Sequence, residues 1–197
     1  MILGITMQPM MSLRQVRILE DALRDLRRSP VRVLEWGSGA STSHFPVFLE
    51  RLGIACSWLS VEHDRGWFES VSRNAAGNPN VRVVLVEPPP GMNPKSRECA
   101  MDEYVAFPAS AGGPYDFILV DGRKRRRCLL EARRLLSPGG VVFLHDARRK
   151  YYRCAFPAFH DSRFVHKHLW RGTNEPLSAL RRAWNRGNRI FHRRFGK

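Results

Sequence analysis

The chain has 197 residues, 43% of them hydrophobic, which fits one globular domain long enough to bury a core. Its 33 Lys and Arg residues against 18 Asp and Glu give a formal net charge of +15, a balance that favours an anionic partner such as nucleic acid, anionic lipid or a phosphorylated or carboxylated substrate. The four cysteines are scattered without a C-x-x-C pair, which argues against a zinc site and a disulfide scaffold and suits a reducing compartment.

The hydropathy pattern predicts a cytoplasmic protein. The first residues lack the basic start and the long apolar core of a signal peptide, and no apolar run is long enough to span a bilayer. From Arg171 to Lys197 the chain has eight basic residues and one acid, so this extension supplies about half of the net charge. The extension is a candidate for peripheral membrane contact or for nucleic-acid binding, and a solvated basic surface is the alternative.

The first part of the chain predicts an N-terminal helix over residues 12–29 and the start of an α/β core. Ser12 and Gln15 have the spacing of a capping box, and apolar residues recur at helical spacing up to Leu26. Apolar runs of strand character follow at residues 31–35, 56–62 and 81–86. Helices are expected between them, over residues 43–52 and from Asp64 to about residue 78.

The second part continues the alternation of strands and helices up to residue 170. Strands are expected over 115–120 and 141–144, with a helix over 125–136 and a turn at 137–140 between them. One or two more strands are expected from Arg163, and a helix near 177–184 within the basic extension 171–197. This order predicts a single α/β domain, 1–197, with a doubly wound, mostly parallel sheet.

Residues 87–114 interrupt the alternation, because they lack clear periodicity and are rich in Pro and Gly. A connection this long in a compact domain indicates a lid or a binding loop, and its apolar residues from Met101 to Phe107 predict a short helix over a site. A disordered insertion is the alternative.

The most informative segment is Glu35-Trp-Gly-Ser-Gly-Ala-Ser-Thr42, which links the first strand to the next helix. Gly37 and Gly39 would let the backbone approach a ligand closely, and the helix start offers unpaired N–H groups. A carboxylate at Glu35 would repel a pyrophosphate and attract a cationic ligand. S-adenosylmethionine, which carries a sulfonium and an ammonium group, is such a ligand.

Together with three later segments, this loop resembles the class I (Rossmann-like) S-adenosylmethionine-dependent methyltransferases, and most of all their small O-methyltransferase-type members. The later segments are Val61-Glu-His-Asp64, Tyr115-Asp-Phe-Ile-Leu-Val-Asp-Gly122 and Leu136-Ser-Pro-Gly-Gly-Val-Val-Phe-Leu-His-Asp146. The resemblance covers about Val31 to Asp146. It implies a Rossmann-like methyltransferase fold with S-adenosylmethionine as the cofactor.

The resemblance also implies which residues contact the cofactor. They lie in the glycine loop and at the ends of the second and fourth strands: Glu35, Trp36, Gly37, Ser38, Gly39, Ser41, Thr42, Glu62, His63 and Asp121. Glu35 would hold the methionine ammonium, directly or through water. Glu62 would accept hydrogen bonds from the ribose hydroxyls, and the alternative for Glu62 is a simple cap of the next helix.

Three polar residues at strand ends are candidate catalytic groups: Asp121, His145 and Asp146. His145 would act as general base on a substrate hydroxyl with Asp146 orienting it, which favours an oxygen nucleophile. The alternatives are a histidine satisfied by backbone contacts and, for Asp121, a strand-ending turn. Asp121 and Asp146 are also candidate ligands of a divalent metal, although two carboxylates without an obvious third ligand are a thin set.

Arg123 is the candidate substrate-binding residue, because it begins a basic run just past Asp121 and Arg binds carboxylate or phosphate in a bidentate way. We therefore expect O-methylation of a small or sugar-like acceptor, a small molecule or a glycan, that carries an anionic group. A solvated helix face is the alternative for this run.

Three rival functions remain in view: an NAD(P)-dependent oxidoreductase, an RNA or other nucleic-acid methyltransferase, and a non-catalytic fold that binds S-adenosylmethionine. The first is disfavoured because Thr42 stands where the dinucleotide motif has its third glycine. The second is disfavoured because the fourth strand ends in Val120-Asp-Gly122 instead of the N/D-P-P-Y/F set of base-amino methyltransferases. The sequence does not identify the acceptor or the oligomeric state.

Overall fold

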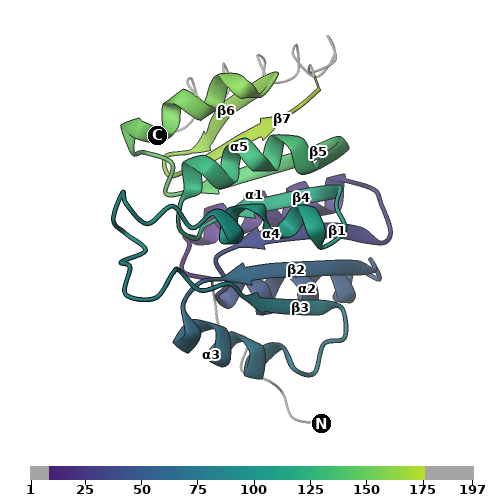
Figure 1. The fold of residues 1–197 in the computed structure, drawn as a ribbon. Helices are drawn as coiled ribbons and strands as arrows, with labels where there is room; N and C mark the ends of the chain where they lie inside the picture. The colour runs from purple at the N-terminus through teal and green to yellow at the C-terminus, as the bar shows by residue number, and fades with distance from the viewer. Residues whose placement is uncertain (1–8, 176–197) are drawn as a thin grey trace.

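The computed structural model describes residues 9–175, which form one seven-stranded sheet in the order β3-β2-β1-β4-β5-β7-β6 (Figure 1). The strands are β1 (Val31–Trp36), β2 (Cys56–Glu62), β3 (Val81–Leu85), β4 (Tyr115–Val120), β5 (Leu136–His145), β6 (Asp161–His166) and β7 (Leu169–Thr173). The helices are α1 (Leu13–Asp25), α2 (Ala40–Arg51), α3 (Arg65–Ala75), α4 (Asp102–Ser110), α5 (Arg125–Leu135) and the 3₁₀-helix η1 (Lys150–Ala158). β1 to β5 pair in parallel, and β7 pairs antiparallel with both β5 and β6. The doubly wound, mostly parallel sheet expected from the sequence is confirmed.

Local signals in the sequence set the starts of the first helices. The Ser12 hydroxyl accepts a hydrogen bond from the Gln15 N–H (3.3 Å) while Gln15 Oε1 accepts one from the Ser12 N–H (2.9 Å), so the predicted capping box begins α1. Asp64 caps α3, since its carboxylate accepts a hydrogen bond from the Trp67 N–H (3.0 Å).

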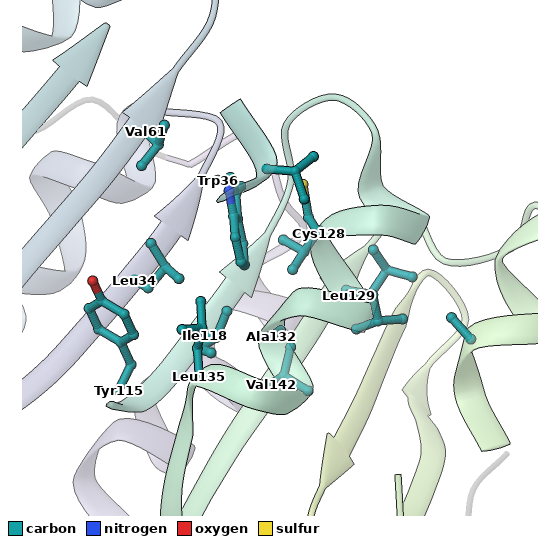
Figure 2. Packing of buried hydrophobic residues seen from close by; sticks show 14 of the residues in the cluster. Leu34, Trp36, Val61, Tyr115, Ile118, Cys128, Leu129, Ala132, Leu135 and Val142 are labelled. Carbon is teal, nitrogen blue, oxygen red and sulfur yellow. The ribbon is translucent and has the colours of Figure 1, made fainter. Parts of the chain in front are cut away.

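The sheet separates two apolar layers. Alternate residues of β1 face opposite ways: Val31 and Val33 pack with α1 and α2, whereas Leu34 and Trp36 pack with α4 and α5. Figure 1 shows α4 and α5 in front of the sheet and α1 and α2 behind it. Figure 2 shows Trp36 lying against the α5 side chains near Cys128, within the front layer. Because helices cover both faces of the sheet, the near-continuous apolar runs of β1, β4 and β5 bury side chains on both faces.

Several predicted boundaries differ from the structure, and α1, which was expected to reach residue 29, ends at Asp25. α2 begins at Ala40 instead of residue 43, because the Thr42 N–H donates to the Gly39 carbonyl (3.1 Å) and the first helical turn forms directly after the second glycine. The turn expected at residues 137–140 lies within β5, where Leu136 pairs with Tyr115 and Val141 pairs with Phe117. The extra residues form an irregularity in the pairing of β4 with β5. The sequence therefore located the interruption correctly, but it lies within a strand and is not a turn between a helix and a strand.

Two expectations for the later part of the chain are confirmed, one element was missed and one prediction is untested. The short helix expected near Met101 is present as α4, and the further strands expected from Arg163 are the β6–β7 hairpin. The 3₁₀-helix η1 was not predicted. The helix expected near 177–184, like most of the basic extension, lies outside the described residues.

The loops after β1 and β4 meet in a contact that only glycine permits. Gly37 has φ +91°, and a Cβ added to it would lie 2.4 Å from the Gly122 Cα. A Cβ on Gly122 would in turn lie 2.9 Å from the Gly37 nitrogen and 2.0 Å from the Tyr104 hydroxyl. Gly39 differs, because its Cβ would meet nothing closer than the Ser41 Oγ at 4.0 Å. The first glycine of the loop is therefore needed for packing, and the second faces open space.

We expect Gly37→Ala to lower the free energy of unfolding by roughly 2–4 kcal/mol, because the new methyl group collides with backbone that cannot move independently. Gly39→Ala is the matched control and should change it by less than about 1 kcal/mol. Urea denaturation followed by circular dichroism measures both. Equal stability of the two variants would contradict the proposed Gly37–Gly122 contact.

Candidate active site

Four carboxylates lie at one edge of the sheet, at or just past the carboxyl ends of parallel strands. Glu35 and Glu62 belong to β1 and β2, and Asp121 and Asp146 follow β4 and β5. Ligands of doubly wound sheets bind beyond this edge, near the switch in strand order between β1 and β4. Figure 1 shows the long connection from β3 to α4 projecting beyond the same edge.

Glu35 is completely buried and fully engaged inside the fold. Its carboxylate accepts hydrogen bonds from the Ser41 and Thr42 hydroxyls at the start of α2, and from the Trp58 indole N–H (3.0 Å) and the Ser60 hydroxyl (3.1 Å) of β2. Ser41 and Thr42, expected to contact the cofactor, direct their hydroxyls to this carboxylate. The expected direct contact between Glu35 and a ligand ammonium is therefore not what this geometry offers, because the carboxylate lies beneath the loop with four donors of its own.

Burial raises the pKa of Glu35 from its ordinary 4.5 to about 7, although the hydrogen bonds from Ser41, Thr42, Trp58 and Ser60 lower it. The cost of removing the charge from water thus exceeds the stabilisation from four donors by about 3 kcal/mol. Glu35 supports the glycine loop, and near neutral pH it is only partly charged.

The loop itself presents backbone to the crevice. The Trp36 side chain is buried and its indole N–H donates to the Tyr104 carbonyl (3.1 Å), which ties β1 to α4, so only the backbone of Trp36 is available to a ligand. The Gly39 N–H donates to the Thr42 Oγ1 (3.0 Å), which fixes the entry into α2. The open side of the loop is at Gly39, as its free Cβ position indicates.

Glu62 closes β2 with its carboxylate directed at the glycine loop. One oxygen accepts hydrogen bonds from the backbone N–H of His63 (2.7 Å) and of Asp64 (2.9 Å), and the other from the Ser38 N–H (2.8 Å) and hydroxyl (3.2 Å). The His63 Nδ1 also lies 2.6 Å from this carboxylate. Burial raises the pKa of Glu62, but the side chain of His63 and the backbone N–H of Asp64 more than reverse that shift and hold the pKa below its ordinary value. Glu62 is therefore an ionised acceptor beside the loop.

Asp121 and His145 form a pair across the ends of β4 and β5. The His145 Nδ1 lies 3.0 Å from the Asp121 Oδ1, and the imidazole side chain is 10% exposed. The orienting partner of His145 is thus Asp121, and the sequence-based assignment of that part to Asp146 is wrong. Asp146 has φ +53°, its side chain is half-exposed, and its carboxylate lies 3.9 Å from both Arg125 and His168.

Arg125 holds these two strand ends together. Its guanidinium donates to the carbonyls of Asp121 (2.6 Å), Gly122 (2.9 Å) and His145 (2.6 Å), and it lies 2.8 Å from the Asp121 carboxylate. Sequence reasoning counted Arg125 with the basic run and missed this part, although the Asp121–Arg125 spacing of four residues at a helix start was a usable signal. Arg123, the candidate substrate-binding residue, is half-buried in the turn between β4 and α5.

A metal-binding cluster and a membrane-spanning helix are both absent from the described residues. Within residues 9–175, no three His, Cys, Asp or Glu side chains gather as they would around a metal ion. None of the helices in this part of the chain combines the length and the apolar character that a bilayer crossing needs.

No protein-family model matches the sequence, and no curated protein does. Solved structures do match. A methyltransferase-like protein from Silicibacter pomeroyi aligns with a TM-score of 0.63 at 19% identity, over 90% of this chain and 94% of that one. A precorrin-6y C5,15-methyltransferase from Geobacter metallireducens aligns with a TM-score of 0.53 at 13% identity, over 86% and 93%. The MycE methyltransferase of the mycinamycin pathway, solved with Mg, SAH and mycinamycin VI, gives 0.54 at 15% identity over 84% of this chain and 49% of its own length.

The chain has the class I methyltransferase fold. Strand order, the antiparallel β7 and the alignment over most of the chain agree on this point. The aligned part of this chain covers about half of the length of MycE, so the comparison concerns only that half of MycE. Gly39, Glu62, Asp121 and His145 lie at or just past the ends of parallel strands, the edge at which ligands of doubly wound sheets bind.

The raised pKa of Glu35 makes stability depend on pH. An acid whose pKa is higher in the folded chain favours folding at low pH, and this contribution is lost as pH rises from about 4.5 to about 7. The free energy of unfolding of the wild type, measured against Glu35→Gln, should therefore fall by roughly 2–3 kcal/mol between pH 5 and pH 8. Urea denaturation of both proteins at the two pH values measures it. A difference that stays constant with pH would show that Glu35 ionises normally.

Proposed function

We propose that the protein is an S-adenosylmethionine-dependent methyltransferase that methylates an oxygen of a small or sugar-like acceptor carrying an anionic group. The fold supports the first part, and the juxtaposition of the open Gly39 loop, the Glu62 carboxylate and the Asp121–His145 pair at one sheet edge carries the proposal. A fold alone does not assign a function, so the case depends on these side chains.

The residues present fit the adenosyl part of this cofactor. The open side at Gly39 leaves room for a ligand beside loop backbone. Glu62 is 3% exposed and already accepts four hydrogen bonds, so its ionised carboxylate would bind a ribose hydroxyl in exchange for one of them. The 3.2 Å hydrogen bond from the Ser38 hydroxyl is the longest that Glu62 accepts, so a ribose hydroxyl would replace it at least cost. Glu35 would act on the ammonium only through the loop that it supports.

When bound, S-adenosylmethionine supplies a methyl group already activated by its positively charged sulfur. The protein then has to position the acceptor and remove its proton. With Nδ1–H donating to Asp121, the free Nε2 of His145 is the atom that takes the proton of an acceptor hydroxyl, and Asp121 stabilises the imidazolium that results. The carbonyls held by Arg125 keep both groups in place. This pair is why we favour an oxygen nucleophile.

Arg123 is the proposed contact for the anionic group of the acceptor. It follows Asp121 by two residues and lies at the crevice end of β4, whereas Arg125 is consumed by internal bonds. A planar guanidinium there suits a carboxylate or a phosphate.

Cofactor binding is the first test. Calorimetry should detect S-adenosylmethionine and S-adenosylhomocysteine binding, and no NAD binding at the same concentrations. Glu62→Gln should weaken the binding at least about tenfold, because a charge-assisted acceptor is replaced by a neutral one. Glu50→Gln, on the exposed end of α2, is the matched control and should leave the affinity unchanged. Binding of NAD in place of S-adenosylmethionine would refute the proposal.

Catalysis is the second test, with an acceptor found by screening anionic sugars and phenols with methyl-labelled cofactor. His145→Asn should lower kcat by about 10²-fold or more without changing cofactor affinity, because it removes the group that takes the proton. Asp121→Asn should also lower kcat, because it removes the carboxylate that orients His145 and stabilises the imidazolium. Asp146→Asn should change kcat only slightly, since Asp146 contacts neither ring nitrogen of His145.

The same acceptor distinguishes the binding part from the catalytic part. Arg123→Ala should raise the acceptor KM, and Arg126→Ala, which removes the same charge from an exposed position of α5, should not. An acceptor KM that responds equally to both would leave only general charge attraction. Cofactor binding with no acceptor turning over would favour a non-catalytic protein.

A further inference from the structure

A second polar cavity lies at the opposite edge of the sheet, by the amino ends of the strands. It has a volume of about 220 Å³, and its lining includes Arg32 of β1, Ser57 of β2, Arg82 of β3, Asn80 and Tyr115. Arg32 pairs with Ser57 and Arg82 pairs with Leu59, so these side chains stand on one face of the sheet. The face is the one covered by α4 and α5, because Leu59 belongs to that layer.

The cavity exists because this part of the face is incompletely covered. α4 has nine residues and ends at Ser110, and the chain then turns through Gly112 into β4. No residue of β3 is fully buried, unlike those of β4. Arg32 and Arg82, with Ser57 between their strands, therefore form a polar end of a face on which Leu34, Leu59 and Val61 belong to the apolar layer.

The charge of the cavity is one-sided. Its lining holds two arginines and no carboxylate. Within residues 9–175, no hydrogen bond or ion pair is made by the side chain of Arg32 or Arg82, whereas Arg28, Arg65 and Arg125 each pair with an acid. Because both guanidinium groups line one hollow without an acid beside them, an anion bound there would be attracted by both.

Tyr115 positions the guanidinium group of Arg32 at the cavity. The Arg32 Cζ lies 5.9 Å from the centre of the Tyr115 ring, and the Tyr115 hydroxyl donates to the Pro108 carbonyl (3.1 Å), which anchors the ring. Burial raises the pKa of Tyr115, while the positive charges of Arg32 and Arg82 oppose that shift. Arg32, Arg82 and Tyr115 line the same cavity, in agreement with this electrostatic effect of both guanidinium groups on the phenol.

We propose that this cavity binds the phosphate group of a small phosphate monoester. Two guanidinium groups from β1 and β3 suit a dianion with several equivalent oxygens, and the Ser57 hydroxyl and the Asn80 amide supply neutral donors beside them. At about 220 Å³ the cavity is below the size of a drug-sized ligand site, so it accommodates the phosphate and a small organic group. It lies at the other edge of the sheet from Glu62 and Asp121, so this site is independent of the proposed methyl transfer.

The full-length protein can be titrated with inorganic phosphate and with phenyl phosphate by calorimetry, at a constant ionic strength of about 0.15 M. We expect saturable binding of one equivalent. Arg32→Gln and Arg82→Gln should each raise the Kd at least about tenfold, because each removes a charge-assisted hydrogen-bonding group. Arg73→Gln, which removes the same charge from the last turn of α3, is the matched control and should leave the Kd unchanged.

Further measurements separate loss of phosphate binding from loss of folding and from unspecific charge attraction. Arg82 is exposed, so its variant should fold normally, which circular dichroism checks, even if the half-buried Arg32 proves sensitive. Arg32→Lys should bind with intermediate affinity, because it keeps the charge and loses the planar fork. Equal losses in the Arg73, Arg32 and Arg82 variants would overturn the proposal in favour of unspecific attraction. Equally tight binding of acetate, or binding of an oligonucleotide without binding of phenyl phosphate, would also overturn it.

Discussion

The buried carboxylate of Glu35 is the interaction on which the rest of the crevice depends. It accepts hydrogen bonds from the first turn of α2 and from the side chains of β2, so one residue of β1 joins three elements beneath the glycine loop. Burying this carboxylate costs free energy, as its raised pKa indicates. In return, the hydrogen bonds that Glu35 accepts hold the loop backbone in place. From the sequence, this carboxylate was expected to bind the ligand directly, but in the structure it supports the loop beside which a ligand would bind.

The two halves of the crevice are fixed by different means. On the β1–β2 side, Glu62 accepts hydrogen bonds from the Ser38 backbone N–H and hydroxyl, and Glu35 accepts them from the Ser41 and Thr42 hydroxyls. On the β4–β5 side, Arg125 binds the strand-end carbonyls and the Asp121 carboxylate. The halves meet at the close Gly37–Gly122 contact, where neither loop has a side chain to separate them. Cofactor and acceptor would thus lie against backbone that is held from both sides, which suits a reaction governed by alignment.

The fold could be predicted almost completely from the sequence, because apolar runs, caps and glycine turns act locally. The periodicity predicted the five parallel strands, whereas the start of α2, the end of α1 and the nature of residues 137–140 were mistaken and η1 was not predicted. The site was less accessible. Sequence position indicated that Glu35, Asp121, His145 and Asp146 approach one edge, but the partner of each side chain depends on which way it points. Hence the pairing of His145 with Asp121 and the internal use of Arg125 followed only from the three-dimensional arrangement.

The two outermost strands also bear on how the molecule behaves in a crowded solution. An edge strand has backbone N–H and C=O groups free on one side, and these can pair with a strand of another chain. β6 has Asp161 and Arg163 among its residues and a register irregularity between Phe164 and His166, while β3 has the exposed, charged Arg82. Because a bent or charged edge strand pairs poorly with a strand of another chain, these features should protect the protein from aggregation through its edge strands.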